Sequence, residues 1–130
     1  MIYYSTNNNY SSDNLLVCIP GLGTNHSLFS EFILELNNLN LFIISPDLRG
    51  CGKSIDIDGE FSINEAVEDI KEILDSHKNY NVVLFGYSQG GKVAQLFAKK
   101  FPDQISGLFL CNTFAKTPVT FKAIIEADLF

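Results

Sequence analysis

Ser88 is the residue whose sequence surroundings most clearly indicate chemistry. The apolar run Val82-Val83-Leu84-Phe85 leads into Gly86-Tyr87-Ser88-Gln89-Gly90, a Gly-x-Ser-x-Gly turn, and a helical pattern follows. A strand that turns sharply into a helix holds such a serine in a strained conformation with its hydroxyl exposed, and glycines flank it because side chains there would clash. The pattern therefore predicts a nucleophile elbow, in which the serine hydroxyl attacks a carbonyl carbon.

The base that such a serine requires is harder to assign. A serine hydroxyl is a weak nucleophile unless a histidine takes its proton and a carboxylate orients that histidine. The chain has two histidines, His26 and His77, and neither is among the 42 residues that follow Ser88. His77 ends a predicted helix, where an imidazole can bond the last carbonyls, and we expect a capping or surface role for His26. Base and acid stay unassigned.

The elements that must position Ser88 follow a strand, turn and helix period that predicts an α/β fold with a parallel sheet. Amphipathic helices are expected over Leu28 to Leu36, after a Ser62–Glu65 capping box, and from about Gly90 to Lys100, where Pro102 ends the helix. The predicted strands are apolar throughout, as in a sheet covered on both faces; they are Leu15 to Ile19, Leu41 to Ser45, Val82 to Phe85 and Leu108 to Cys111. We expect a three-layer sandwich.

Length and composition predict one globular domain. The chain has 130 residues, of which 46% are hydrophobic, and we expect residues 1–14 to form a frayed strand and loop and 117–130 to begin a cap or lid. A net charge of -6 argues against nucleic acid as a partner. No apolar run reaches the roughly 20 residues of a membrane span. Three cysteines without Cys-x-x-Cys spacing predict neither disulfides nor a metal site, so the expected location is cytoplasmic.

Two phosphate-binding patterns fail on single residues. Gly50-Cys51-Gly52-Lys53-Ser54 resembles the end of a P-loop, but the spacing would require glycine where Asp47 places a carboxylate. The run from Gly21 to His26 follows a strand, but His26 occupies the position of the third glycine of a dinucleotide fingerprint. We therefore expect no nucleotide, and no other cofactor.

Three motifs in order resemble those of the alpha/beta-hydrolase superfamily. Cys18-Ile19-Pro20-Gly21-Leu22-Gly23 is similar to its oxyanion loop, Pro46 to Ser54 contains an Asp-x-Arg-Gly-x-Gly-x-Ser loop, and the turn at Ser88 is the third motif. The resemblance begins at Leu15 and covers almost the whole chain from there. It implies an incomplete domain of this fold, and we expect Asp47 and Arg49 to brace their loop against the elbow.

The resemblance also implies an activity and its residues. Ser88 would be the nucleophile, and the backbone N–H groups of Leu22 and Gln89 would form the oxyanion hole. Family members carry the acid and the histidine after later strands, and where some place the acid this chain has Asn112-Thr113. Asp103, Glu126 and Asp128 are not assigned to that role.

Two functional interpretations stay open. One is a serine hydrolase of a small or lipid-like ester, thioester or related carbonyl substrate, its triad completed by a missing segment or a second chain. The other is a non-catalytic fragment that binds a small molecule or a partner. Because Leu108 to Cys111 would leave an apolar strand at the sheet edge, we also expect the isolated chain to be poorly soluble or to need a partner.

Overall fold

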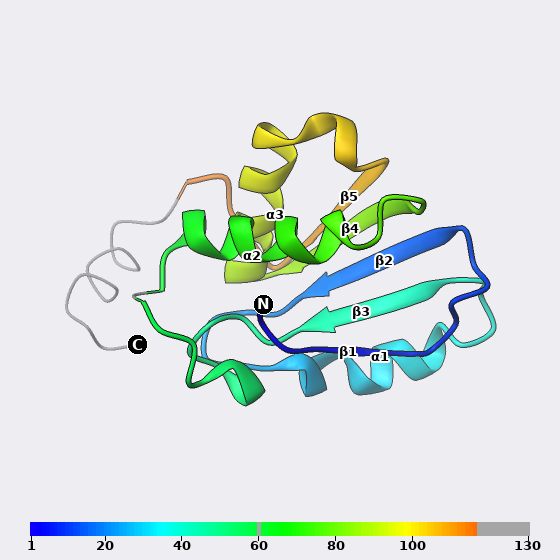
Figure 1. The fold of residues 1–130 in the computed structure, drawn as a ribbon, viewed down its shortest axis with the longest axis horizontal. Coiled ribbons are helices and arrows are strands. Elements are labelled where there is room, and N and C mark those ends of the chain that lie inside the picture. Colours follow the sequence, from blue (N-terminus) through cyan, green and yellow to red (C-terminus); the bar gives the residue numbers. More distant parts are fainter. Residues whose placement is uncertain (60, 117–130) are drawn as a thin grey trace.

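A five-stranded sheet forms the centre of the computed structural model, which describes residues 1–59 and 61–116. The strand order is β1-β3-β2-β4-β5 (Figure 1). The strands β2, β3, β4 and β5 are parallel, and β1 pairs with β3 in the antiparallel direction. Their bounds are β1 Tyr4–Thr6, β2 Asn14–Ile19, β3 Phe42–Pro46, β4 Asn81–Tyr87 and β5 Gly107–Cys111. The four predicted strands are therefore present, each with bounds shifted by no more than two residues at either end.

Two helical layers flank the sheet (Figure 1). The longer helices are α2, which spans Ile63–Asp75, and α3, which spans Gln89–Lys100. The first expected helix is instead a 3-10 turn, η1 His26–Phe29, followed by the short α1 Ser30–Glu35. Two further 3-10 turns are η2 Gly52–Ser54 and η3 Pro102–Gln104. The predicted cap or lid, with Glu126 and Asp128, lies outside the described residues.

Alternate residues of β2, β3 and β4 point into two separate cores, as the pleat of a sheet requires. On the face of α2 and α3, Val17, Ile44 and Leu84 pack with apolar residues of both helices. On the opposite face, Cys18 and Ile43 pack with η1 and α1. The sheet thus lies between two helical layers, which confirms the predicted three-layer α/β sandwich.

The sheet is unevenly covered at its two sides. Every residue of β3 is buried, which fits the expectation of strands covered on both faces. In β5 that expectation is wrong, because Leu108, Phe109 and Leu110 are 36%, 63% and 45% exposed. The expectation of an apolar strand at the sheet edge is met, since β5 is the terminal strand of the order. Among the described residues, no helix is both long enough and apolar enough to cross a bilayer.

Candidate active site

Ser88 lies between β4 and α3 with a backbone conformation that side chains rarely adopt. Its φ is 53° and its ψ is -119°. This conformation costs energy for a residue with a Cβ, and such residues cluster where the surrounding structure holds them for a purpose. The Ser88 N–H donates to the carbonyl of Cys111 at 3.0 Å, so β5 fixes the turn from one side.

Glycines around Ser88 are required by the close approach of three backbone segments. A Cβ on Gly86 would lie 2.6 Å from the Cα of Gly91, where β4 meets the first turn of α3. A Cβ on Gly90 would lie 2.5 Å from the carbonyl oxygen of Pro20 and closer still to that of Ile19. The helix therefore begins in direct contact with the end of β2, which brings the loop after β2 beside Ser88.

That loop forms a closed turn around Leu22. The carbonyl of Gly21 accepts hydrogen bonds from the Thr24 N–H at 3.3 Å and the Thr24 hydroxyl at 2.7 Å. Gly23 has a φ of 72°, which suits the third position of a type II turn. A Cβ built on Gly21 would lie 3.3 Å from the Cβ of Ser88. The turn that carries Leu22 is thus packed directly against the serine.

Three polar groups at this point have no hydrogen-bond partner among the described residues. Among residues 1–59 and 61–116, neither the Leu22 N–H nor the Gln89 N–H has a hydrogen-bond acceptor, and the Ser88 hydroxyl has no partner. The only fully buried side-chain polar atom without a partner in the described residues is Thr113 Oγ1, so the Ser88 oxygen reaches the surface. Two N–H donors and one hydroxyl therefore lie at the carboxyl edge of the central strands, where ligands of parallel sheets bind.

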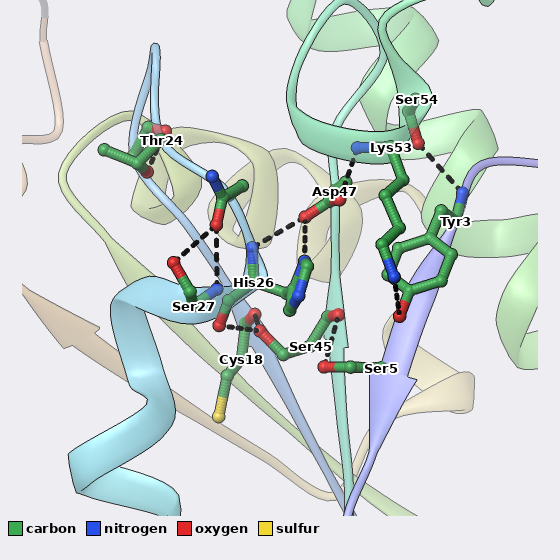
Figure 2. A network of polar contacts seen from close by, with 12 residues as sticks. Tyr3, Ser5, Cys18, Thr24, His26, Ser27, Ser45, Asp47, Lys53 and Ser54 are labelled. Carbon is green, nitrogen blue, oxygen red and sulfur yellow. Dashed lines mark hydrogen bonds and ion pairs between the residues drawn. The ribbon is translucent and has the colours of Figure 1, made fainter.

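Asp47 holds the loops beside this edge together, as Figure 2 shows. Its carboxylate is fully buried at the end of β3. One oxygen accepts from the His26 backbone N–H at 2.6 Å and lies 2.7 Å from His26 Nδ1, and the other accepts from the Lys53 N–H at 2.8 Å. A Cβ on Gly52 would overlap this carboxylate, which accounts for the glycine there. Asp47 thus joins the loop after β2 to its own loop.

The charge of Asp47 is stabilised despite its burial. Burial raises the pKa of this carboxyl, but the N–H groups of His26 and Lys53 and the His26 ring lower it, and the net pKa lies below the ordinary value. An ionised carboxylate that accepts several N–H bonds forms strong, short hydrogen bonds. The arrangement keeps the loop that leads from Leu22 into η1 in one position.

Arg49 braces its loop against a helix and not against the turn at Ser88. Its guanidinium donates to both oxygens of the largely buried Asp69 on α2, at 2.8 Å and 2.7 Å. It also lies 3.5 Å from Glu65. The expected bracing of the elbow by Asp47 and Arg49 is therefore wrong in its target, because the contacts of Asp47 go to the loop after β2 and those of Arg49 go to α2.

The same ion pair changes the expected capping box. The Ser62 hydroxyl accepts from the Glu65 N–H at 3.1 Å, as predicted. The Glu65 carboxylate turns towards Arg49 and makes no return bond to the N-cap. Sequence spacing indicated the cap but gave no sign of a competing partner 16 residues away.

Both histidine rings contact groups other than Ser88 within the described residues. The His26 ring contacts Asp47 and lies 5.2 Å from the ring of Tyr3. Both partners lie on the β3 and β1 side of β2, whereas Ser88 follows β4, which lies on the other side of β2. Of the two roles expected for His26, capping is wrong, because Asn25 is the N-cap of η1; the His26 side chain is 25% exposed and therefore lies partly at the surface. The Nδ1 of His77 lies 2.7 Å from the carbonyl of Ile73, which confirms its expected place at the end of α2.

Residues 112–116, the described part of the segment after β5, contain no carboxylate side chain. Thr113 lies against Gly91 in the first turn of α3, because a Cβ on that glycine would lie 2.5 Å from the threonine hydroxyl. Asn112 has a φ of 48°. The Asp103 side chain lies in η3, which precedes β5 and therefore belongs to the opposite edge of the sheet. Within the part of the chain that the structure describes, no group of three or more His, Cys, Asp or Glu could hold a metal ion.

Comparison with known proteins matches residues 14–130 to the alpha/beta hydrolase fold. The chain is 32% identical to ethanol acetyltransferase 1 of Cyberlindnera fabianii over 114 residues, which cover 86% of this chain and 34% of that protein. It is 28% identical to a proline iminopeptidase of Saccharolobus solfataricus over 115 residues, which cover 86% of this chain and 37% of that protein. The structure of MenH from S. aureus superimposes with a TM-score of 0.80 and 27% identity, over 99% of this chain and 48% of MenH. The chain thus spans about a third of those two relatives and about half of MenH.

Proposed function

Because the chain belongs to the alpha/beta hydrolase family, we propose that it is the front part of a serine hydrolase in which Ser88 is the nucleophile. The observation that carries the proposal is the conformation of Ser88, with a φ of 53° and a hydroxyl that has no partner among the described residues. A strained residue that leaves a nucleophilic oxygen free has little structural reason to be there.

The proposed chemistry is attack on a carbonyl carbon. The Ser88 oxygen forms a bond to that carbon while its proton passes to a histidine, and the carbonyl electron pair moves onto the carbonyl oxygen. The N–H groups of Leu22 and Gln89, which have no acceptor within the described residues, are the proposed donors to that oxyanion. When the carbonyl re-forms, the leaving group departs with the proton.

Histidine and acid are proposed to come from outside this chain's described residues. His26 and His77 are both engaged elsewhere, and the loop after β5 presents Asn112 and Thr113. The substrate class is an ester, thioester or related carbonyl compound, because the names of similar proteins include an enol-lactonase, a methylesterase and an acetyltransferase. The proposed location is the cytoplasm, since all three cysteines are unpaired.

Fluorophosphonate labelling tests the nucleophile directly. The chain is incubated with the probe with and without added imidazole, which takes the place of the proposed histidine base, and the modified residue is identified by peptide mass. We expect labelling at Ser88 that imidazole accelerates at least tenfold, abolished by Ser88→Ala and kept by the control Ser106→Ala. Labelling of Ser88 no faster than that of other serines contradicts the proposal.

A binding module without turnover is the second candidate, and the occupation of both histidines favours it. In that case the Ser88 hydroxyl and the two N–H groups would bind a carboxylate or carbonyl ligand and not react. The same samples distinguish the two candidates, because this one predicts no labelling with imidazole but a rise in melting temperature with butyrate. Ser88→Ala would then reduce the rise without removing it.

A further inference from the structure

His26 is attached to the end of β3 through its backbone and through its ring. Its N–H donates to Asp47 Oδ1 at 2.6 Å, and its carbonyl accepts from the Ser45 hydroxyl at 3.3 Å (Figure 2). Its ring nitrogen Nδ1 lies 2.7 Å from the same oxygen of Asp47. An ionised carboxylate only accepts hydrogen bonds, so Nδ1 carries a proton and donates to Asp47. Ser45 and Asp47 are both fully buried, so His26 is held by rigid partners.

The turn that carries Leu22 ends next to His26. This turn comprises residues 21–24, and only Asn25 separates it from His26. One end of the turn is fixed, because its first glycine packs on Ser88. The other end leads directly into η1, which begins at His26. The contacts of His26 therefore fix the end of the turn that lies away from Ser88.

The loop after β3 keeps Asp47 in place for this contact. The Lys53 N–H donates to Asp47 Oδ2 at 2.8 Å, so the two carboxylate oxygens have partners on different loops. A Cβ on Gly52 would lie 2.9 Å from the Cβ of Asn25, so these loops also touch at the residue before His26. Asp47 therefore cannot follow the turn if the turn moves, because its second oxygen is held by its own loop.

We propose that His26 is a positioning residue for the oxyanion hole, because the bond from its ring to Asp47 holds the turn where the Leu22 N–H can donate to the oxyanion. The ring takes no proton from Ser88 and does not touch the reacting atoms. Without the ring bond, a buried ionised carboxylate would lose one of its donors, and the His26 N–H alone would hold the turn to Asp47. The inference rests on the proposed function for the role of the Leu22 N–H, but the attachment of the turn does not depend on Ser88.

Two substitutions of His26 separate the ring bond from the ring itself. His26→Phe keeps an aromatic ring beside Tyr3 and removes the donor, whereas His26→Asn returns an N–H group at the position of Nδ1. The first measurement is amide exchange of the Thr24 N–H by NMR, because this group donates to Gly21 and reports whether the turn is closed. We expect exchange about tenfold faster in His26→Phe and within about twofold of the parent in His26→Asn. Unchanged exchange in His26→Phe would overturn the proposal.

Fluorophosphonate labelling of Ser88 with added imidazole is the second measurement, because the phosphoryl oxygen of the probe would occupy the proposed oxyanion hole. We expect His26→Phe to be labelled about tenfold more slowly than the parent, since a small misplacement of an oxyanion donor is costly. His26→Asn should restore the rate to within about twofold of the parent.

Arg49→Lys is the matched control for the labelling. It weakens a contact between the neighbouring loop and Asp69 on α2 and so destabilises the fold without a change at His26. Its labelling rate should equal that of the parent at a temperature at which circular dichroism shows every variant to be folded. Equal slowing in Arg49→Lys and His26→Phe would show a general loss of stability and would overturn the proposal.

The two measurements keep this inference distinct from the proposed nucleophile. If Ser88 is not labelled in the parent chain, the nucleophile role fails, and exchange of the Thr24 N–H decides whether His26 holds the turn. If Ser88 is labelled at the same rate in the parent and in His26→Phe, the nucleophile role stands and the positioning role fails.

Discussion

Replacing Gly90 with alanine is the sharpest perturbation of the contact between α3 and the end of β2. The added Cβ would lie 2.5 Å from the carbonyl oxygen of Pro20, where real Cβ atoms stay beyond 3.0 Å, and nearer still to that of Ile19. Both obstacles are backbone atoms and cannot rotate away. The start of the helix must therefore move outwards by roughly 1 Å, which separates packed groups that gain from close contact.

The size of the effect follows from two opposing terms. Overpacking costs about 1–3 kcal/mol, and a clash with rigid backbone belongs at the upper end of that range. Alanine gains about 1 kcal/mol over glycine inside a helix. We therefore expect Gly90→Ala to lower the free energy of unfolding by about 2 kcal/mol, as measured by urea unfolding with far-UV circular dichroism.

Gly107→Ala is the matched control for that measurement. A Cβ at Gly107 would lie 3.4 Å from Val83 Cγ2, an ordinary contact with a side chain. Glycine in a strand costs about 0.5–1 kcal/mol relative to alanine, so this variant should be as stable as the parent or slightly more stable. Equal urea midpoints for Gly90→Ala and the parent would refute the close packing of α3 against β2.

Three further changes test the loops and the core. Asp47→Asn should lower the free energy of unfolding by about 1–3 kcal/mol at pH 7. Because the pKa of Asp47 is lowered in the folded state, the stability that its charge contributes is present above the unfolded pKa of about 3.9 and is lost as the pH falls through the folded pKa. Urea unfolding should therefore show a smaller difference in stability between the variant and the parent at pH 3 than at pH 7. Arg49→Lys should cost about 1–2 kcal/mol in thermal unfolding, since lysine cannot bind both oxygens of Asp69, whereas Lys100→Ala in an exposed pair should cost less than about 1 kcal/mol. Burial raises the pKa of the Cys18 thiol to about 12, so a disulfide reagent should modify the other two cysteines in the folded chain and Cys18 only in urea.

The elements that could be predicted from the sequence are those whose signal is local. The strand before Ser88, the cap at Ser62 and the end of α3 before Pro102 each depend on a few adjacent residues. The expected helix from Leu28 to Leu36 had the correct apolar spacing, but its first turn is 3-10. Spacing alone does not distinguish the two, because residues three apart share a face in both helices.

Partners distant in sequence account for what could not be predicted. Asp47 meets His26 across 21 positions, and Arg49 meets Asp69 across 20. An Asp-x-Arg motif indicates that both side chains matter but not which element they bind. The antiparallel pairing of β1 with β3 is of the same kind, because the three-residue strand from Tyr4 has no pattern of its own.

The candidate site contains groups that the described residues position and needs other groups that these residues do not supply. The loop with Leu22 is closed by Thr24 and packed on Ser88 through Gly21, so both proposed N–H donors are positioned by contacts within β2, β4 and α3. The histidine and the acid that we propose for proton transfer are not supplied by residues 1–59 and 61–116, in which β5 is the last strand of the sheet and both histidines have other partners. The geometry of the proposed oxyanion hole therefore depends on described residues, whereas the groups proposed for proton transfer do not lie among them. Added imidazole should then raise the reactivity of Ser88 towards a fluorophosphonate without any change in the amide exchange of β5, and a change in both would contradict this division.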